Sequence, residues 1–204
     1  MTINGKTSLD IVLAGVGGQG TLVAGRILGA LAQALGLDAK VSEVHGMSQR
    51  GGSVITYARL GEKVHSPILE RGQADFLLAF EELEALRWAG LLRRDGAALI
   101  STQRVTPLPV SLGTATYPED IPERLENACG SHARVVRVDA PGLAAQAGSA
   151  RAVNVVMLGA MAAMTDVPVE AWHDAIDHVL AERLRAVNHE AFRLGYGVPS
   201  RGLL

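Results

Sequence analysis

Gly15-Val16-Gly17-Gly18-Gln19-Gly20 is the stretch of sequence that decides the expected fold. It fits the pattern G-x-G-x-x-G and follows a short apolar run at residues 11–14, which is typical of a buried strand. From Gly20 onward the apolar residues recur at helical spacing, and Gly36 follows them where the end of a helix favours glycine. Residues 39–44 then indicate a second strand. Together these features predict a β–glycine turn–α–β unit, whose usual form is a parallel, Rossmann-like βαβ.

A glycine turn in this context suits contact with an anion. Glycines let the backbone turn tightly and approach a phosphate closely, and the helix N-terminus offers it free N–H groups. Glu43 ends the second strand, where a ribose-binding acid would stand in a dinucleotide site. The turn can instead serve helix–strand packing alone, or contact with a partner chain. No lysine of the Walker type follows it, which disfavours a P-loop nucleotidase.

The remaining chain alternates between strand and helix patterns, which predicts a three-layer α/β fold with a mainly parallel sheet. Further strands are expected at residues 53–60, 76–80, 97–101 and 134–138, and a short helix at 119–128. Residues 153–164 predict a helix, and residues 170–194 predict one long amphipathic helix. We expect a single domain over residues 1–204, with 150–196 as its helical C-terminal part. Ligands of such sheets bind beyond the carboxyl ends of the strands.

Composition excludes several classes of function. The chain has 204 residues, 48% of them hydrophobic and 20% charged, with a net charge of −2, which is a globular composition and disfavours nucleic-acid or anionic-membrane partners. The single cysteine, Cys129, can form neither an internal disulfide nor a four-thiolate zinc or iron–sulfur site. No apolar run approaches the roughly 20 residues of a membrane span. No signal peptide is recognised, so a cytoplasmic location is expected.

A second cluster of polar and glycine residues follows the second strand: Glu43-Val44-His45-Gly46-Met47-Ser48-Gln49-Arg50-Gly51-Gly52. Such a density of these residue types is typical of a site loop. Arg50 can bind a phosphate or carboxylate through two N–H groups, and His45 can exchange a proton near neutral pH. Taken singly, each is equally compatible with a surface arginine and a loop histidine. Their occurrence in one loop favours the functional interpretation.

Three further groups carry weaker signals. Two histidine–aspartate pairs have i,i+4 spacing, which suits solvated ion pairs far better than a metal site: His173 with Asp177, and Asp174 with His178. Cys129 has no thiolate-activating motif beside it. Glu81, Glu82 and Glu84 follow an expected strand, where capping of the next helix is favoured over lining the ligand crevice.

The two glycine-containing segments together resemble the gamma domain of the 2-oxoacid:acceptor oxidoreductases. Further agreement comes from Ser66-Pro67, from Ala74-Asp75 leading into a strand, and from residues 81–87. The resemblance covers nearly the whole chain. The length of the chain and the sequence of residues 188–196 are most similar to those of the stand-alone beta subunits of the indolepyruvate ferredoxin oxidoreductases in that family.

The resemblance implies an activity that this chain does not perform alone. The family oxidatively decarboxylates a 2-oxoacid with coenzyme A, giving an acyl-CoA, carbon dioxide and reduced ferredoxin. Thiamine diphosphate and the [4Fe–4S] clusters belong to a larger alpha subunit, which agrees with the single cysteine here. The implied residues of the coenzyme A region or partner-cofactor pocket are Gly15, Gly17, Gly18, Gln19, Gly20, Ser48, Gln49, Arg50 and Gly51. His45 is the implied catalytic candidate.

Two other classes of function remain open from the residues. A self-sufficient nicotinamide-dependent dehydrogenase would use the glycine turn and Glu43. A purely structural interaction subunit would use the glycine loops as a docking surface. Within the resemblance itself the 2-oxoacid stays open between indolepyruvate, another aryl pyruvate and a different 2-oxoacid.

Overall fold

The computed structural model describes residues 5, 8–46, 51–130 and 132–199. Its six-stranded sheet has the order β2-β3-β1-β4-β5-β6. The strands are β1 (Ser8–Val16), β2 (Asp38–His45), β3 (Ser53–Gly61), β4 (Ala74–Ala79), β5 (Leu92–Ser101) and β6 (Arg134–Val138). β1, β4, β5 and β6 are parallel to one another, whereas β3 is antiparallel to both of its neighbours. The expectation of a mainly parallel sheet is confirmed.

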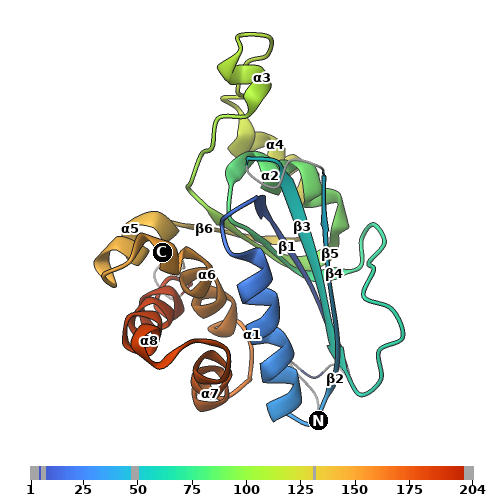
Figure 1. The fold of residues 1–204 in the computed structure, drawn as a ribbon. Coiled ribbons are helices and arrows are strands. Elements are labelled where there is room, and N and C mark those ends of the chain that lie inside the picture. Colours follow the sequence, from blue (N-terminus) through green and yellow to red (C-terminus); the bar gives the residue numbers. More distant parts are fainter. Residues whose placement is uncertain (1–4, 6–7, 47–50, 131, 200–204) are drawn as a thin grey trace.

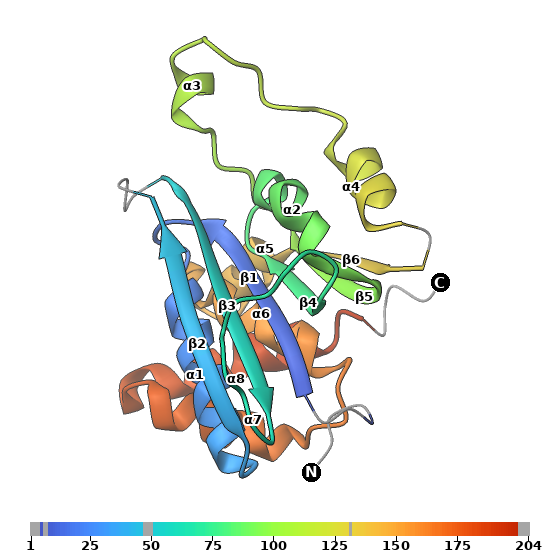
Figure 2. The same ribbon diagram turned by 90° about the vertical axis from the view of Figure 1, so that its right-hand side faces the viewer.

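The first βαβ unit differs from the expected form in one respect, because β3 lies between β1 and β2. β2 and β3 pair antiparallel from Asp38 opposite Gly61 to His45 opposite Val54. A short connection such as the one after His45 can return the chain only antiparallel to the strand it left. β3 therefore pairs with β2, and it takes the place beside β1 that a Rossmann unit gives to the second strand (Figure 2).

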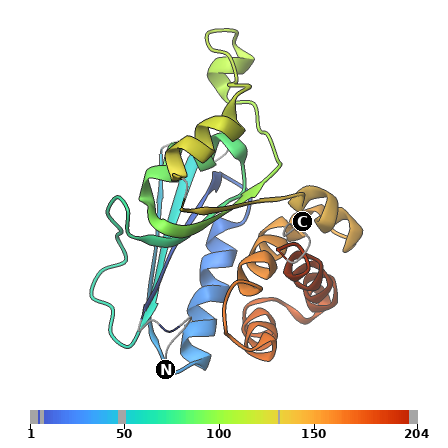
Figure 3. The ribbon, with the colours of Figure 1, turned by 180° about the vertical axis from the view of Figure 1, so that it is seen from behind.

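Helices cover both faces of the sheet, which confirms the three-layer architecture (Figure 1). Figure 3 shows the helices of the C-terminal part gathered on the side of α1. The helices of this face are α1 (Thr21–Ala34), α5 (Ala140–Gln146), α6 (Val153–Ala162), α7 (Val169–Val179) and α8 (Glu182–Tyr196). The other face carries α2 (Glu82–Trp88) and α4 (Ile121–Cys129), with a 3-10 turn at Ala89–Leu91. Alternate residues of β1 explain the two layers, since Ile11 faces α1 whereas Val12 faces α2.

The helix expected over residues 170–194 is two helices, so that prediction was wrong. Leu180 and Ala181 are extended, with φ/ψ of −99°/141° and −58°/143°, and they separate α7 from α8. The break lets α7 pack on α1 while α8 packs on α6. Arg185 stabilises it by donating to the carbonyl oxygens of Asp177, at 2.8 Å, and of Leu180, at 3.4 Å.

α6 and α8 pack closely because glycines meet at their crossing. All ten residues of α6 are buried. A Cβ atom on Gly195 of α8 would overlap the carbonyl group of Val156, and one on Gly159 of α6 would overlap that of Phe192. The two helix backbones are therefore in direct contact. In the described part of the chain, no helix is both long and apolar enough to cross a membrane.

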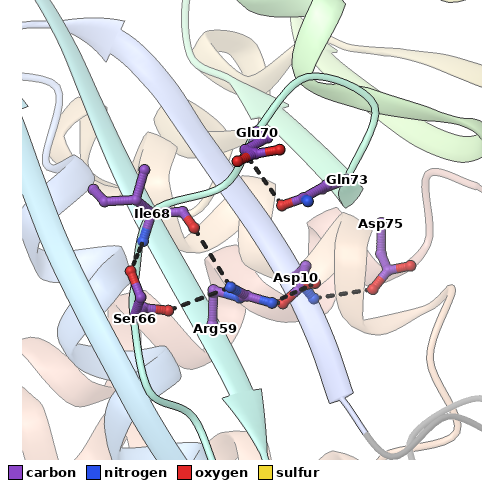
Figure 4. Close-up of polar contacts among 7 residues, drawn as sticks. All are labelled: Asp10, Arg59, Ser66, Ile68, Glu70, Gln73 and Asp75. Carbon is purple, nitrogen blue, oxygen red and sulfur yellow. Dashed lines mark hydrogen bonds and ion pairs between the residues drawn. The ribbon is translucent and has the colours of Figure 1, made fainter.

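The connection from β3 to β4 is tied across the amino end of β1 (Figure 4). Arg59 donates to the carboxylate of Asp10 at 2.9 Å and to the carbonyl oxygens of Ser66 and Ile68, each at 3.4 Å. Asp75 accepts a hydrogen bond of 2.9 Å from the amide of Asp10. The segments Ser66-Pro67 and Ala74-Asp75 thus lie at the end of β1 opposite the glycine turn, where they hold the fold together.

Residues 105–117, which we call the arm, contain the short helix α3 (Leu108–Ser111). The arm projects from the same end of the sheet as the glycine turn (Figures 1 and 2). Leu108 and Leu112 are largely exposed on it, at 69% and 68%. Both ends of the arm are bound to one buried carboxylate, because Glu81 accepts hydrogen bonds from the amide of Val105, at 3.1 Å, and from the hydroxyl of Tyr117, at 2.6 Å. The base of the arm is therefore fixed to the body of the protein.

Candidate functional site

The described ends of the second glycine-containing segment, His45 and Gly52, lie near the glycine turn at the carboxyl end of β1. The amide of Gly17 donates a hydrogen bond of 2.9 Å to the carbonyl oxygen of Gly52, just before β3. This contact brings Gly51 and Gly52 to the glycine turn. Three of the expected site residues, Ser48, Gln49 and Arg50, lie outside the described residues.

The glycine turn has the backbone that its sequence demands. Gly18 and Gly20 have φ of +105° and +83°, a region that side-chain-bearing residues rarely adopt. Gly20 is the N-cap of α1, and no side chain caps that N-terminus. Gly15 is placed differently, since it belongs to β1 and lies beneath Gln19 and Phe80. Gly17, Gly18 and Gly20 line an open cavity, although a Cβ on Gly20 would also collide with the side chain of Asn154, whereas Gly15 packs inside.

The side chain of Gln19 fills the crevice between the carboxyl ends of β1 and β4. Its Oε1 accepts from the amide of Val16 at 2.7 Å, and its Nε2 donates to the carbonyl oxygen of Phe80 and to Gln103 Oε1, both at 3.0 Å. β1 and β4 are adjacent in the sheet, and the helices that follow them, α1 and α2, lie on opposite faces. Open α/β sheets usually bind ligands beyond the carboxyl ends of two such strands. Here the amide of Gln19 occupies that point, so open space lies to either side of the turn instead.

The first open space is a cavity of about 360 Å³ on the β2 side of the turn. It is lined by Gly17, Gly18, Gly20, Thr21, Leu22, Glu43, His45 and Val54. Glu43 accepts hydrogen bonds from the hydroxyls of Thr21, at 3.1 Å, and of Thr56, at 3.3 Å. His45 is exposed at the end of β2. The turn, Glu43 and His45 therefore share one cavity, as their order in the sequence suggested.

Two features disfavour the dinucleotide interpretation of Glu43. In a Rossmann unit the ribose-binding acid ends the strand next to β1. Glu43 stands one strand further away, because β3 intervenes. One of its carboxylate oxygens, Oε2, is moreover already shared by two hydroxyl groups.

The second open space is a cleft of about 490 Å³ on the α6 and α8 side of the turn. Gly18 and Gly20 border it as well, and the amide of Asn154 at the start of α6 donates to the carbonyl oxygen of Gly20 at 3.2 Å. Arg151 and Arg183 line the same cleft. None of these three residues was predicted from the sequence as part of a site, and only the interruption of an apolar run by Asn154 could have signalled one of them.

The three glutamates after β4 are buried and bonded. Glu81 caps α2 by accepting from the amide of Glu84 at 2.9 Å, so capping is confirmed for it. Glu82 pairs with Arg104, at 2.5 Å, and with Arg137. Glu84 accepts from the hydroxyl of Ser53 and from Arg87 and Trp88, each of the latter two at 3.2 Å. These carboxylates join the edge of the sheet to α2 and the arm.

Tyr117 is the group whose titration this arrangement alters most visibly. Burial and the hydrogen bond to Glu81 raise the pKa of its phenol above the ordinary value of 10.0. The guanidinium of Arg104 lies over its ring, with 5.6 Å between Cζ and the ring centroid. The phenol is therefore a neutral donor at the base of the arm.

The weaker candidates are structural. Asp177 accepts from His189 Nε2 at 2.6 Å, while the ring of His173 packs against that of His189 with 4.4 Å between centroids. Burial and the neighbouring His189 lower the pKa of His173. Cys129 is buried in α4, and burial raises the pKa of its thiol. Among the described residues no group of three or more histidine, cysteine, aspartate or glutamate side chains is arranged to hold a metal.

Comparison with known proteins agrees with the fold and the motifs. The family model described as pyruvate ferredoxin/flavodoxin oxidoreductase matches residues 10–198. The indolepyruvate oxidoreductase subunit IorB of Pyrococcus horikoshii is 40% identical over 190 residues, 91% of this chain and 93% of that one. The gamma subunit of a keto/oxoacid ferredoxin oxidoreductase from Geobacter sulfurreducens has the same fold, with a TM-score of 0.71, 24% identity, and coverage of 95% and 99% of the two chains.

A third comparison shows this fold inside a longer chain. The 2-oxoglutarate:ferredoxin oxidoreductase of Magnetococcus marinus, solved with 2-oxoglutarate, coenzyme A and succinyl-CoA, matches with a TM-score of 0.73 and 18% identity. The match covers 96% of this chain but 32% of that one. In that protein the equivalent of this chain is about a third of one polypeptide.

Proposed function

The chain belongs to the pyruvate ferredoxin/flavodoxin oxidoreductase family, and from that premise we propose that it is the smaller subunit of an enzyme acting on indolepyruvate or another aryl pyruvate. The proposed reaction is an oxidative decarboxylation. The bond between the carboxylate and the oxo carbon breaks, carbon dioxide leaves, and the acyl group joins the thiol sulfur of coenzyme A. Two electrons pass to ferredoxin and the thiol proton is released. The name of the 40% identical relative supports the choice of substrate.

We place the redox-active groups on a larger partner subunit. A [4Fe–4S] cluster takes four cysteine thiolates, whereas this chain has one cysteine, which is buried in α4. Its residues therefore do not fit a cluster, and thiamine diphosphate is assigned to the same partner. Under this proposal residues 1–204 act as one gamma-type domain of a cytoplasmic complex.

The role proposed for this chain is to hold coenzyme A at the edge where the partner completes the site. Gly18 and Gly20 place backbone N–H groups beside the uncapped start of α1, which suits phosphate oxygens, while the N–H of Gly17 is bonded to Gly52. The main support for this role is the hydrogen bond between Gly17 and Gly52, because it joins the turn to the end of the segment that contains Arg50. The guanidinium of Arg50 supplies the charge that backbone groups lack.

His45 is proposed to exchange a proton in the same cavity. Its ring is exposed at the end of β2, and the cavity also contains the carboxylate of Glu43. The two ring nitrogens of an imidazole can accept and donate a proton, so His45 has the chemistry that this role needs. The thiol proton of coenzyme A is the one that this chain would receive.

The test is reconstitution from separate subunits. The purified chain is assayed for indolepyruvate-dependent dye reduction with coenzyme A, first alone and then with the proposed large subunit. We expect turnover only in the mixture. Activity of this chain without the large subunit would refute the proposal that the redox-active groups lie on the partner. Full activity of the large subunit without this chain would refute the proposal that this chain contributes to the site.

A further inference from the structure

The cleft on the α6 and α8 side of the glycine turn is chemically unlike the cavity that contains Glu43. We call it the arginine cleft and define it by its lining residues: Gly18, Gln19, Gly20, Val23, Gln103, Ser149, Ala150, Arg151, Ala152, Val153, Asn154, Leu180, Arg183, Leu184, Val187 and Asn188. Its volume of about 490 Å³ is within the usual range of small-molecule sites, roughly 300–1,000 Å³.

The charge of the arginine cleft is of one sign. Arg151 and Arg183 are its two charged residues, and no carboxylate lines it. Within the described ranges, neither guanidinium makes a hydrogen bond or an ion pair with another side chain. Other exposed arginines are paired with nearby acids: Arg124 with Asp120, the N-cap residue of α4, and Arg193 with Glu190. Two guanidinium groups are thus left with their donors available in the same cleft.

The backbone adds to this positive character. The cleft is bordered by Gly20, Ala152 and Leu180, which stand at or just before the N-termini of α1, α6 and α8. No side chain caps the N-termini of α1 and α8, whereas at the start of α6 the amide of Val155 is bonded to Asn154 Oδ1. Helix N-termini carry partial positive charge and free N–H groups, and they reinforce the arginines in attracting an anion.

We propose that the arginine cleft binds a phosphate or diphosphate group of a small molecule through Arg151 and Arg183. Guanidinium groups match phosphate oxygens with paired N–H donors, and the uncapped helix starts supply further ones. The proposal concerns this chain alone and does not depend on the activity proposed above.

The test is calorimetric titration of the purified full chain with inorganic pyrophosphate, at low and moderate salt. We expect saturable binding that weakens with salt, at least tenfold weaker binding in Arg151→Gln and in Arg183→Gln, and none measurable in the double variant. Arg26→Gln is the matched control, because Arg26 is exposed on α1 and does not line the cleft. All variants should unfold at the temperature of the parent chain.

A second titration identifies the source of the phosphate. Coenzyme A that competes with pyrophosphate, and that loses affinity in the same two variants, would be a ligand of this cleft. Coenzyme A that binds without competing would make the cleft a site for another phosphate ester. Absence of pyrophosphate binding at millimolar concentration, or equal binding by the double variant and the parent, would overturn the proposal while leaving the reconstitution result unaffected.

Discussion

The amide of Gly17 donates a 2.9 Å hydrogen bond to the carbonyl oxygen of Gly52, and so joins two segments separated by the whole of α1 and β2. Neither segment is specific alone, since glycine turns occur in many α/β proteins. Their contact places Gly52, the last residue before β3, at the carboxyl end of β1.

Arg50→Ala tests whether the loop after β2 binds coenzyme A or docks the partner. A site role predicts that the KM for coenzyme A rises about tenfold or more in the assembled enzyme, because a charge-assisted contact to phosphate is lost. The amount of complex recovered by size-exclusion chromatography should stay unchanged. The KM for coenzyme A of Arg50→Lys should lie between those of the parent and of Arg50→Ala, since lysine keeps the charge but not the paired donors. Weaker assembly with an unchanged KM would instead identify a docking role.

Gln19→Leu should destabilise the protein by about 1–3 kcal/mol, because the amide of Val16 and the carbonyl of Phe80 lose their partner. Urea denaturation followed by circular dichroism measures the change. Gln33→Leu is the control, an exposed position on α1 where we expect less than about 0.5 kcal/mol. Equal stability of the two variants would show that the Gln19 amide is not needed to hold the crevice.

Gly195→Ala should destabilise by about 1–3 kcal/mol, since the added methyl group forces α8 away from Val156 of α6. Gly29→Ala serves as the contrast, because a Cβ there meets nothing within 4 Å in the middle of α1. That variant should be stabilised by about 0.5–1 kcal/mol through helix propensity. Thermal unfolding of both variants checks the opposite signs.

Tyr117→Phe should alter the stability of the protein in alkali. Because the pKa of Tyr117 is raised in the folded state, the neutral phenol stabilises the fold below pH 10, and this contribution is lost as the pH rises above 10. The variant lacks the hydrogen bond to Glu81, so it should be less stable at pH 8, and the difference from the parent should shrink towards pH 11. Unfolding curves across that range, with Tyr196→Phe as an exposed control, measure it. A constant difference would show that the phenol does not titrate as described.

The local elements were predictable because each has a strong pattern. The glycine turn after β1, the length of α1 and the strand at residues 134–138 all follow from spacing and from the residues that end them. The position of β3 was not predictable in the same way. The sequences of β1 and β2 suit either adjacent or separated strands, and pairing across the whole sheet decides between them.

The break between α7 and α8 was hidden for a related reason. Neither glycine nor proline marks it, and Leu180 continues the apolar spacing of α7. It is imposed by packing on two different helices. The arginine cleft was equally hidden, because Arg151 and Arg183 lie about 130 and 160 positions after the glycine turn and line the same cleft only in the folded chain.

The attachment of both ends of the α3 arm to Glu81 has a consequence for how this fold tolerates change. A projecting segment whose entry and exit are fastened at one point can be lengthened, trimmed or exchanged without shifting the strands beneath it. The arm is therefore the place to graft a reporter or an affinity peptide, and the place where descendants of this sequence can diversify while their sheet stays the same.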